Sequence, residues 1–155
     1  MKPDKLGVEL FNRDRLIISH ATTPLRYTLF WRGECDFRDP TEALGPTLRG
    51  VLPELRDRRL VLDFRGLNFM NSSSVSPILM FIKAACSRGI PVHLVYNVNL
   101  SWQRTTASSM RALSRSLRNL SVELQGAQEA YPAEDEVASA SASASARSDR
   151  SDLKD

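Results

Sequence analysis

The chain has 155 residues, 42% of them hydrophobic and 25% charged, and a formal net charge of +3. This length and composition suit one globular domain with a core of its own. No apolar run approaches the ~18 residues of a membrane-spanning helix, and no signal-peptide core follows the first residues, so we expect a cytoplasmic protein without membrane insertion.

Strands predominate in the first third of the sequence. Turn residues separate three short apolar runs, which we predict to be strands: Leu6–Phe11, Leu16–His20 and Tyr27–Arg32. A helix is predicted over residues 39–55, with Asp39 as its N-cap and Pro40 in its first turn. Pro46 and Pro53 fall inside that helix and each removes a backbone donor, so the helix should be kinked or in two pieces.

The central third contains a strand–helix–strand unit. Leu60–Phe64 is a short apolar run, Arg65–Met70 is expected to be a connector, and an apolar helix opens at residues 71–74, Asn-Ser-Ser-Ser. Val92–Val98 predicts the next strand. Such a unit places the serines at the carboxyl end of a parallel strand, where ligand and partner contacts gather.

Pro77 locates the start of the regular helix. If Ser74 is the N-cap, Pro77 is the third helical residue, where no intrahelical hydrogen bond is lost. If Ser72 is the N-cap, one bond is lost. We therefore expect Ser72 to lie on an exposed turn just before the helix, accessible to a kinase.

The last ordered elements are predicted to be a helix and a strand. Ser101 is the expected N-cap of a helix that ends near Ser116, and Leu117–Leu124 is the last strand or a helix-to-strand transition. The alternation of β and α predicts an α/β domain over residues 1–124, with helices packed on a mostly parallel or mixed sheet. Residues 125–155 are acidic and then alternate Ser and Ala, so we predict a disordered tail.

Two motifs resemble those of STAS domains, the family of bacterial anti-sigma-factor antagonists. The segment Gly33-Glu34-Cys35-Asp36 is similar to the Gly-Glu-Leu-Asp that ends a strand in that family. Asp63 matches the family's strand-end acid, Phe69-Met70 its apolar pair, and Ser72 the serine that a partner kinase phosphorylates. Asn71 stands where the family usually has Asp, and Ser74 where it usually has Gly. The resemblance covers about Arg26 to Val122.

The resemblance implies a partner-switching regulatory protein and no catalytic residue. The unmodified protein would bind a switch serine kinase or anti-sigma factor, phosphorylation of Ser72 would weaken that binding, and a serine phosphatase would restore it. Ser73 and Ser74 are the alternative phosphorylation sites. The predicted partner-binding residues are Asp36, Asn71, Ser72, Ser73, Ser74, Arg111 and Arg115. Because the family has about two strands in this part of the chain, one of the three predicted N-terminal strands would be an added edge strand, either in a longer hairpin or in a homodimer contact.

Basic residues gather in the second half of the domain. Between Arg58 and Arg118 there are nine Arg and Lys residues and one acid, Asp63. Arg111, Arg115 and Arg118 are predicted to share one face of the third helix. That face would be either a solvated surface or a patch for an acidic or phosphate-bearing partner. Aromatic residues are few and no recognition motif is present, so we expect no nucleic-acid partner.

Catalysis, metal binding and cofactors find little support in the sequence. No nucleophile elbow, phosphate loop or dinucleotide fingerprint is present. Cys35 and Cys86 have no Cys or His at ligand spacing, so we predict free thiols, no metal and no cofactor. Three other interpretations remain open: the serines only cap the helix, the domain is an unphosphorylated scaffold subunit of a stress-signalling or lipid-transport assembly, or it is a small-ligand module or an unrecognised enzyme that uses Ser72 and His93.

Overall fold

A computed structural model of the chain describes residues 7–126, so most of the predicted disordered tail, residues 125–155, lies outside the described residues. The elements in chain order are the strands, α-helices and 3-10 turns β1 (Val8–Arg13), β2 (Leu16–Thr22), β3 (Arg26–Cys35), α1 (Pro40–Val51), η2 (Leu52–Leu55), β4 (Arg59–Met70), η3 (Ser72–Ser74), α2 (Val75–Ser87), β5 (Val92–Asn97), α3 (Ser101–Leu113) and β6 (Leu120–Gln125). None of the described helices has the length and apolar character needed to cross a membrane.

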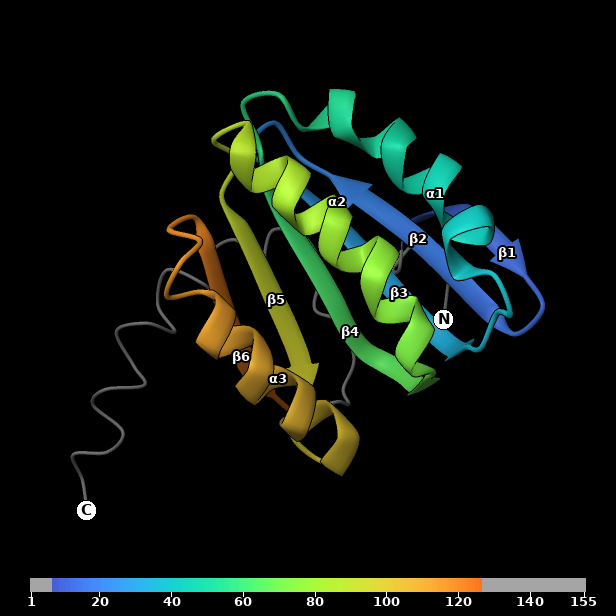
Figure 1. The fold of residues 1–155 in the computed structure, drawn as a ribbon. Coiled ribbons are helices and arrows are strands. Elements are labelled where there is room, and N and C mark those ends of the chain that lie inside the picture. The colour runs from blue at the N-terminus through green and yellow to red at the C-terminus, as the bar shows by residue number, and fades with distance from the viewer. Residues whose placement is uncertain (1–6, 127–155) are drawn as a thin grey trace, which may run out of the picture.

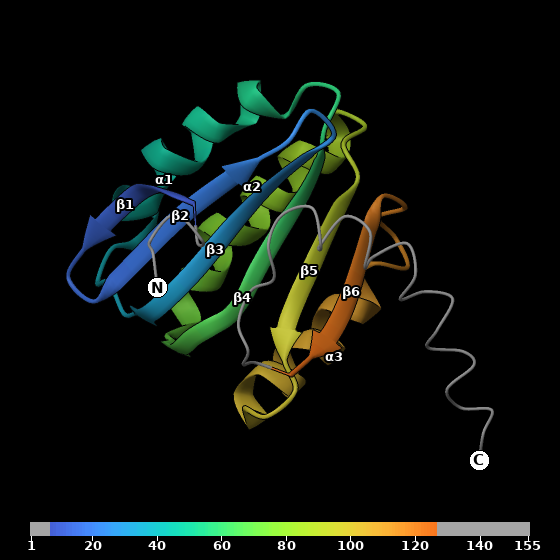
Figure 2. The ribbon, with the colours of Figure 1, turned by 180° about the vertical axis from the view of Figure 1, so that it is seen from behind.

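The strands form one six-stranded mixed sheet in sequence order, β1-β2-β3-β4-β5-β6, as the alternating pattern predicts. The pairs among β1, β2 and β3 are antiparallel, and those from β3 to β6 are parallel. Helices α1, α2 and α3 lie on one face of the sheet (Figure 1), and no described helix covers the other face (Figure 2). The predicted strand–helix–strand unit is β4-α2-β5.

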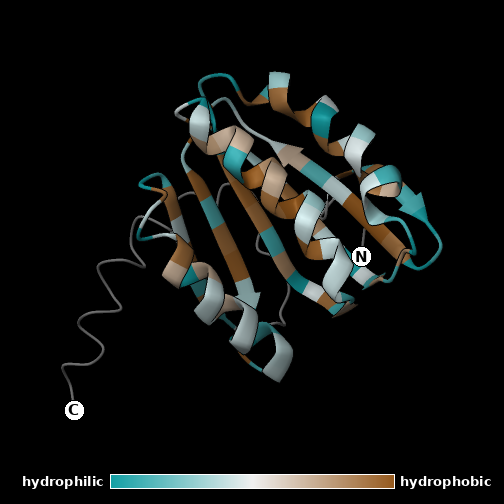
Figure 3. Cartoon of the chain, in the orientation of Figure 1, coloured by the Kyte–Doolittle hydropathy of each residue, from teal (hydrophilic) through white to brown (hydrophobic). Residues whose placement is uncertain are grey.

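The core lies between the helices and the sheet. Alternate residues of the parallel strands point toward the helices, and Figure 3 shows apolar bands along β4, beside α2, and along β5, between α2 and α3. Three buried aromatic rings continue this layer across β3, β4 and β5, with centroids 5.2 Å apart for both Trp31–Phe64 and Phe64–Tyr96. Burial of these rings and of the surrounding leucines provides the main stabilisation of the domain.

Strand β4 is more than twice as long as the predicted strand Leu60–Phe64. The prediction that Arg65–Met70 is a connector is wrong, because this segment pairs with β3 from Arg32↔Gly66 to Cys35↔Met70. Two register shifts interrupt the pairing, and a Cβ on Gly66 would lie 3.1 Å from the Trp31 carbonyl oxygen. The glycine that suggests a loop in the sequence instead permits a close approach of two strands at a bulge.

A glycine is also needed at position 33 for a structural reason. Its φ is +99°, and a Cβ at this position would lie 2.0 Å from the carbonyl oxygen of Arg15, the turn residue just before β2. Glu34 then donates its backbone N–H to that same oxygen over 3.0 Å. The Gly-Glu-x-Asp segment therefore ends β3 as expected, and its glycine is required by the β2–β3 pairing whatever the function of the domain.

The first helix follows the prediction closely. Asp39 is the N-cap, since its Oδ1 accepts the backbone N–H of Glu42 over 3.2 Å. The predicted break also occurs, because α1 ends at Val51 and the chain continues as η2 with Pro53 in its first turn. Pro46 remains inside α1, on its exposed side.

The third helix differs from the prediction at both ends. Its N-cap is Leu100 rather than Ser101, without a side-chain capping bond, and its last residue is Leu113 rather than Ser116. Hydroxyls of Ser114 and Ser116 bond back to the carbonyls of Arg111 and Leu113 over 2.7 and 3.1 Å. Such local bonds compete with helix continuation, and the chain turns here to enter β6.

Strand β1 is the edge of the sheet, as predicted for the additional N-terminal strand. It pairs with β2 from Val8 to Arg13, two residues later than predicted, with an irregularity between Glu9 and Phe11. Val8 and Leu10 are exposed on it. An irregular edge is less suited to continuous pairing with a second sheet, and the homodimer through these strands stays a prediction.

Gln103 is a polar residue in the core that the sequence analysis did not single out. Its side chain is fully buried and joins three elements. Its Nε2 donates to the carbonyls of Phe64 and Leu67, each over 2.8 Å, and its Oε1 accepts the N–H of Asn97 over 2.7 Å. These bonds give partners to backbone groups of β4 and β5 at the point where the pairing of the two strands stops and β4 continues beyond β5.

Replacement of Gln103 by leucine should destabilise the domain by roughly 2–5 kcal/mol, because three buried backbone groups lose their partner. Urea denaturation followed by circular dichroism measures this change. Thr105→Leu, an exposed substitution on the same helix, is the control and should change the free energy of unfolding by less than about 0.5 kcal/mol. Equal effects of the two substitutions would contradict a structural role for Gln103.

Candidate functional site

The ends of β3 and β4 meet at the carboxyl edge of the parallel strands. The backbone N–H of Asn71 donates to the carbonyl of Cys35 over 3.0 Å. The side-chain Nδ2 of Asn71 donates to Asp36 Oδ1 over 3.2 Å and to the Phe37 carbonyl over 3.0 Å. The structure therefore brings Asp36 together with the Asn71–Ser74 segment, two parts of the predicted site that lie far apart in the sequence.

Asn71 also caps the helical segment that follows. Its Oδ1 accepts the backbone N–H of Ser74 over 3.1 Å and the Ser74 hydroxyl over 2.5 Å. Ser74 is the N-cap residue of α2 but makes no side-chain capping bond, so the interpretation that the serines serve as caps is wrong for their side chains. An aspartate at position 71 could accept the same bonds but could not donate to Asp36 and Phe37.

Ser74 is buried beneath this turn. Its hydroxyl oxygen accepts the Cys35 thiol over 3.2 Å, so a chain of hydrogen bonds runs from Cys35 through Ser74 to Asn71. Burial raises the pKa of the Cys35 thiol. Both cysteines are free, as predicted. Ser74 is 0% exposed, so a kinase cannot reach its hydroxyl without opening the turn.

Ser72 and Ser73 are the accessible serines. They are exposed on η3, a single 3-10 turn that precedes α2, and Pro77 is the third residue of α2. This confirms the expectation that Ser72 lies on an exposed turn before the regular helix. The turn stands at the amino end of α2, where unpaired N–H groups and the helix dipole favour negative charge.

Exposed apolar side chains flank this turn. Phe69, three residues before Ser72, is 46% exposed, and Val75, three residues after it, is 42% exposed. Large apolar side chains at a polar edge are typical of surfaces that bind another protein. We call the exposed area formed by Asp36, Phe69, Asn71, Ser72, Ser73 and Val75 the serine-turn surface.

The two arginines of the predicted site lie elsewhere. Arg111 is in the last turn of α3 and Arg115 follows the helix, so the prediction that Arg111, Arg115 and Arg118 share one helical face is wrong. The start of α3 lies near the site, since Trp102 Nε1 donates to the Asn68 carbonyl over 3.0 Å. With 13 residues at ~1.5 Å each, α3 carries its other end about 20 Å away.

Asp63 lies within β4 rather than at its end. Its carboxylate is buried on the helix-free face of the sheet and pairs with Arg65, with Arg65 Nη2 2.7 Å from Asp63 Oδ2. The Arg65 Nη1 group also donates to Gln125 Oε1 over 2.8 Å. Asp63 therefore holds Arg65, which links β4 to the end of β6, and this acid does not contribute to the serine-turn surface.

His93 is also remote from the serines. It pairs in register with Val61, whereas Ser72 follows the end of β4, roughly 30 Å farther along at ~3.3 Å per residue. Its ring nitrogens bond to Ser121 Oγ and Glu123 Oε1, each over 2.7 Å, and the bond to His93 lowers the pKa of Glu123. The suggested Ser72–His93 pair is therefore wrong.

Comparison with known proteins finds similarity to solved structures. No protein-family model and no curated protein matches the sequence. One similar chain is in the crystal structure of diguanylate cyclase SiaD in complex with its activator SiaC from Pseudomonas aeruginosa, at 20% identity over 74% of this chain and 95% of that chain, with a TM-score of 0.48. Another is an uncharacterized DUF3478-family protein with a SpoIIAA-like fold from Shewanella loihica, at 11% identity over 76% of this chain and 90% of that chain, with a TM-score of 0.46. These likenesses concern the arrangement of the chain and not its binding or activity.

Substitution of Asn71 by aspartate should destabilise the domain by about 1–3 kcal/mol, because two donated bonds are lost and a second carboxylate meets Asp36. Chemical denaturation at neutral pH measures the change. Asn68→Asp is the matched control, since Asn68 is exposed on the same strand end. If Asn71→Asp were no more destabilising than Asn68→Asp, the amide of Asn71 would not be what holds the two strand ends together.

Proposed function

We propose that this chain is a partner-switching regulatory protein of the anti-sigma-factor-antagonist type. It binds a switch serine kinase or anti-sigma factor through the serine-turn surface and is released when Ser72 is phosphorylated. A serine phosphatase then removes the phosphate and restores binding. The observation that carries this proposal is the exposure of Ser72 on a rigidly held turn between two exposed apolar side chains, Phe69 and Val75.

The rigidity of the turn supports its use as a docking surface. The side-chain amide of Asn71 bonds to Asp36 and Phe37, just after β3, on one side and to Ser74 on the other, so the serines are held in place without a partner. A surface that is ordered before binding loses less conformational entropy when a protein docks on it.

Phosphorylation would change this surface without requiring the fold to open. A phosphate on Ser72 adds about −2 charges at the amino end of a helical segment, a position that favours anions. The same charge would have to be desolvated between Phe69 and Val75 in a closely packed interface. The modified protein should therefore stay folded but bind its partner less tightly.

The choice among the three serines rests on exposure and on the family resemblance. Ser74 is buried and bonded on both sides, which argues against it. Ser73 is exposed like Ser72. Ser72 is preferred because it aligns, two residues after Met70, with the serine that is modified in the family. Arg111 and Arg115 lie at the far end of α3, roughly 15 Å or more along the helix from the end that meets Asn68, so a partner that binds both regions must span that distance.

The proposal is tested by affinity capture from cell extract with wild type, Ser72→Ala and Ser72→Asp, followed by affinity measurement with the captured kinase or anti-sigma factor. Ser72→Asp should weaken binding by about 1–3 kcal/mol through added charge, with an unchanged circular dichroism spectrum. Ser72→Ala should bind normally and resist release by ATP. Ser108→Asp, exposed on α3, is the charge-matched control and should bind like wild type.

A second pair of variants tests the apolar part of the surface. Phe69→Ala should reduce binding of the same partner, whereas Leu25→Ala, which also removes an exposed apolar side chain but at the opposite edge, should not.

Phosphate mapping by mass spectrometry on protein from cells completes the test. Phosphate on Ser73 alone would overturn the assignment of Ser72, and no phosphate on a protein that still binds and releases its partner would favour the scaffold interpretation.

A further inference from the structure

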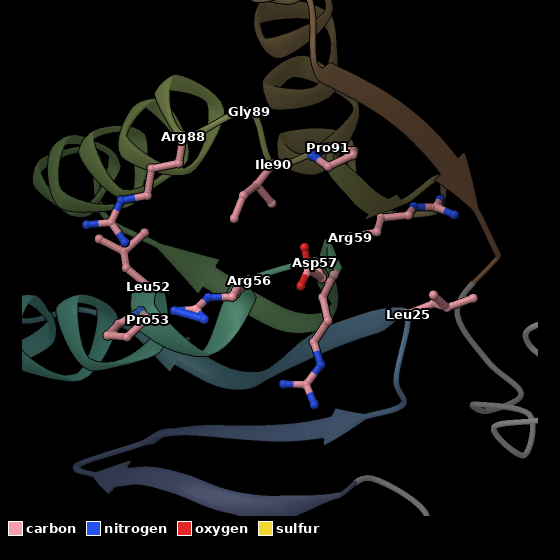
Figure 4. Close-up of a pocket in the computed structure, with 11 residues that line it drawn as sticks. Leu25, Leu52, Pro53, Arg56, Asp57, Arg59, Arg88, Gly89, Ile90 and Pro91 are labelled. Atoms are coloured by element: carbon pink, nitrogen blue, oxygen red, sulfur yellow. The ribbon is translucent and has the colours of Figure 1, made fainter.

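A groove of about 660 Å³ lies at the amino-terminal edge of the parallel strands, opposite to the serine-turn surface. One wall is the segment 52–59, which leads from η2 into β4, and the other is the segment 88–91, which connects α2 to β5 (Figure 4). Leu25, from the turn before β3, closes one end. This volume lies within the range of ~300–1,000 Å³ that is typical of small-molecule sites.

Positive charge dominates this groove. Four arginines and one acid, Asp57, contribute to its lining. Arg58 donates its Nη1 to the Glu54 carbonyl over 2.9 Å. Among the described residues, no hydrogen bond or ion pair is found for the guanidinium groups of Arg56, Arg59 and Arg88. Like charges held around one hollow repel each other, and a bound anion would remove that repulsion.

Helix capping accounts for only part of this arrangement. Segments η2 and α2 both end at the groove, and cations near a helix C-terminus are favoured by the helix dipole. This explains Arg88, at the C-cap of α2, and in part Arg56, at the C-cap of the short η2. It does not explain Arg59, which is the first residue of β4. The positive charge therefore exceeds what the two helix ends require.

The groove also has an apolar wall. Ile90 and Leu52 contribute side chains, and Ile90 is nearly fully buried. In Figure 4, Arg56 and Arg88 extend to the side where Leu52 lies, while Arg59 extends to the other side. A ligand on the side of Leu52 meets Arg56 and Arg88 but not Arg59, and it must combine an anionic group for these two arginines with an organic part for the apolar wall.

We propose that the groove binds a small organic molecule that carries a diphosphate group, with Arg56 and Arg88 on the phosphates and Ile90 and Leu52 against the organic part. Guanidinium groups match phosphate oxygens through paired hydrogen bonds. A diphosphate offers enough acceptors for two guanidiniums that come from different elements. This site is independent of the proposed function, because it lies at the other edge of the sheet and contains no residue of the serine-turn surface.

The test is isothermal titration of the full chain with ADP, GDP and UDP, and with adenosine and inorganic pyrophosphate, at low salt. At least one nucleoside diphosphate should bind more tightly than pyrophosphate, adenosine should not bind, and added salt should weaken binding. Arg56→Glu and Arg88→Glu should each reduce the affinity by about 10-fold or more through charge reversal. Arg104→Glu, exposed at the start of α3 on the opposite edge, is the charge-matched control and should stay within about twofold of wild type.

Circular dichroism and thermal melting establish that each variant is folded, and Arg56→Gln and Arg88→Gln replace any glutamate variant that is not. The proposal is overturned if none of the three nucleoside diphosphates binds at millimolar concentration, or if their binding is unchanged in the Arg56 and Arg88 variants. Binding of pyrophosphate as tight as that of the nucleotides would overturn the role given to Ile90 and Leu52. Loss of partner switching with intact nucleotide binding would concern only the serine-turn surface.

Discussion

The parallel pairing of β3 with β4 is the interaction on which the rest of the structure depends. It joins the antiparallel part of the sheet to the parallel part, and it extends along β4 from Arg59 to Met70. Because the pairing continues past the end of β5, it carries Asn71 to the end of β3, where its amide bonds to Asp36 and Phe37. The turn with Ser72 is therefore held in place by the register of two strands.

The same pairing separates two surfaces of different chemistry. At the carboxyl edge, exposed serines lie between apolar side chains, and the dipole of α2 adds positive potential. At the amino edge, helical segments η2 and α2 end, and arginines accumulate around a groove. Helices that connect parallel strands must begin at one edge and end at the other, so this division follows from the βαβ geometry.

Polar side chains complete the strand ends where backbone pairing stops. The buried Gln103 does so between β4, β5 and α3, and the half-buried Asn71 does so between the segment after β3, the end of β4 and the turn η3. Both are amides, which can donate and accept at once, and neither position could be filled by a carboxylate with the same bonds. An amide at position 71 also leaves the unmodified turn without a charge of its own, so the charge brought by a phosphate on Ser72 would be the larger change.

The sequence by itself determined the alternation of strands and helices, the break before Pro53, the cap at Asp39 and the exposed turn before Pro77, because each depends on neighbouring residues along the chain. It did not reveal that Arg65–Met70 is strand, since a glycine and polar residues break the apolar pattern and only pairing with β3 decides its conformation. An asparagine before a helix is a recognisable capping signal, but its bonds to Asp36 and Phe37 depend on a segment 35 residues earlier. The grouping of Arg56, Arg59 and Arg88, and the separation of Arg111 from Ser72, were likewise decided only by tertiary structure, because spacing along a sequence does not say at which edge of a sheet an element ends.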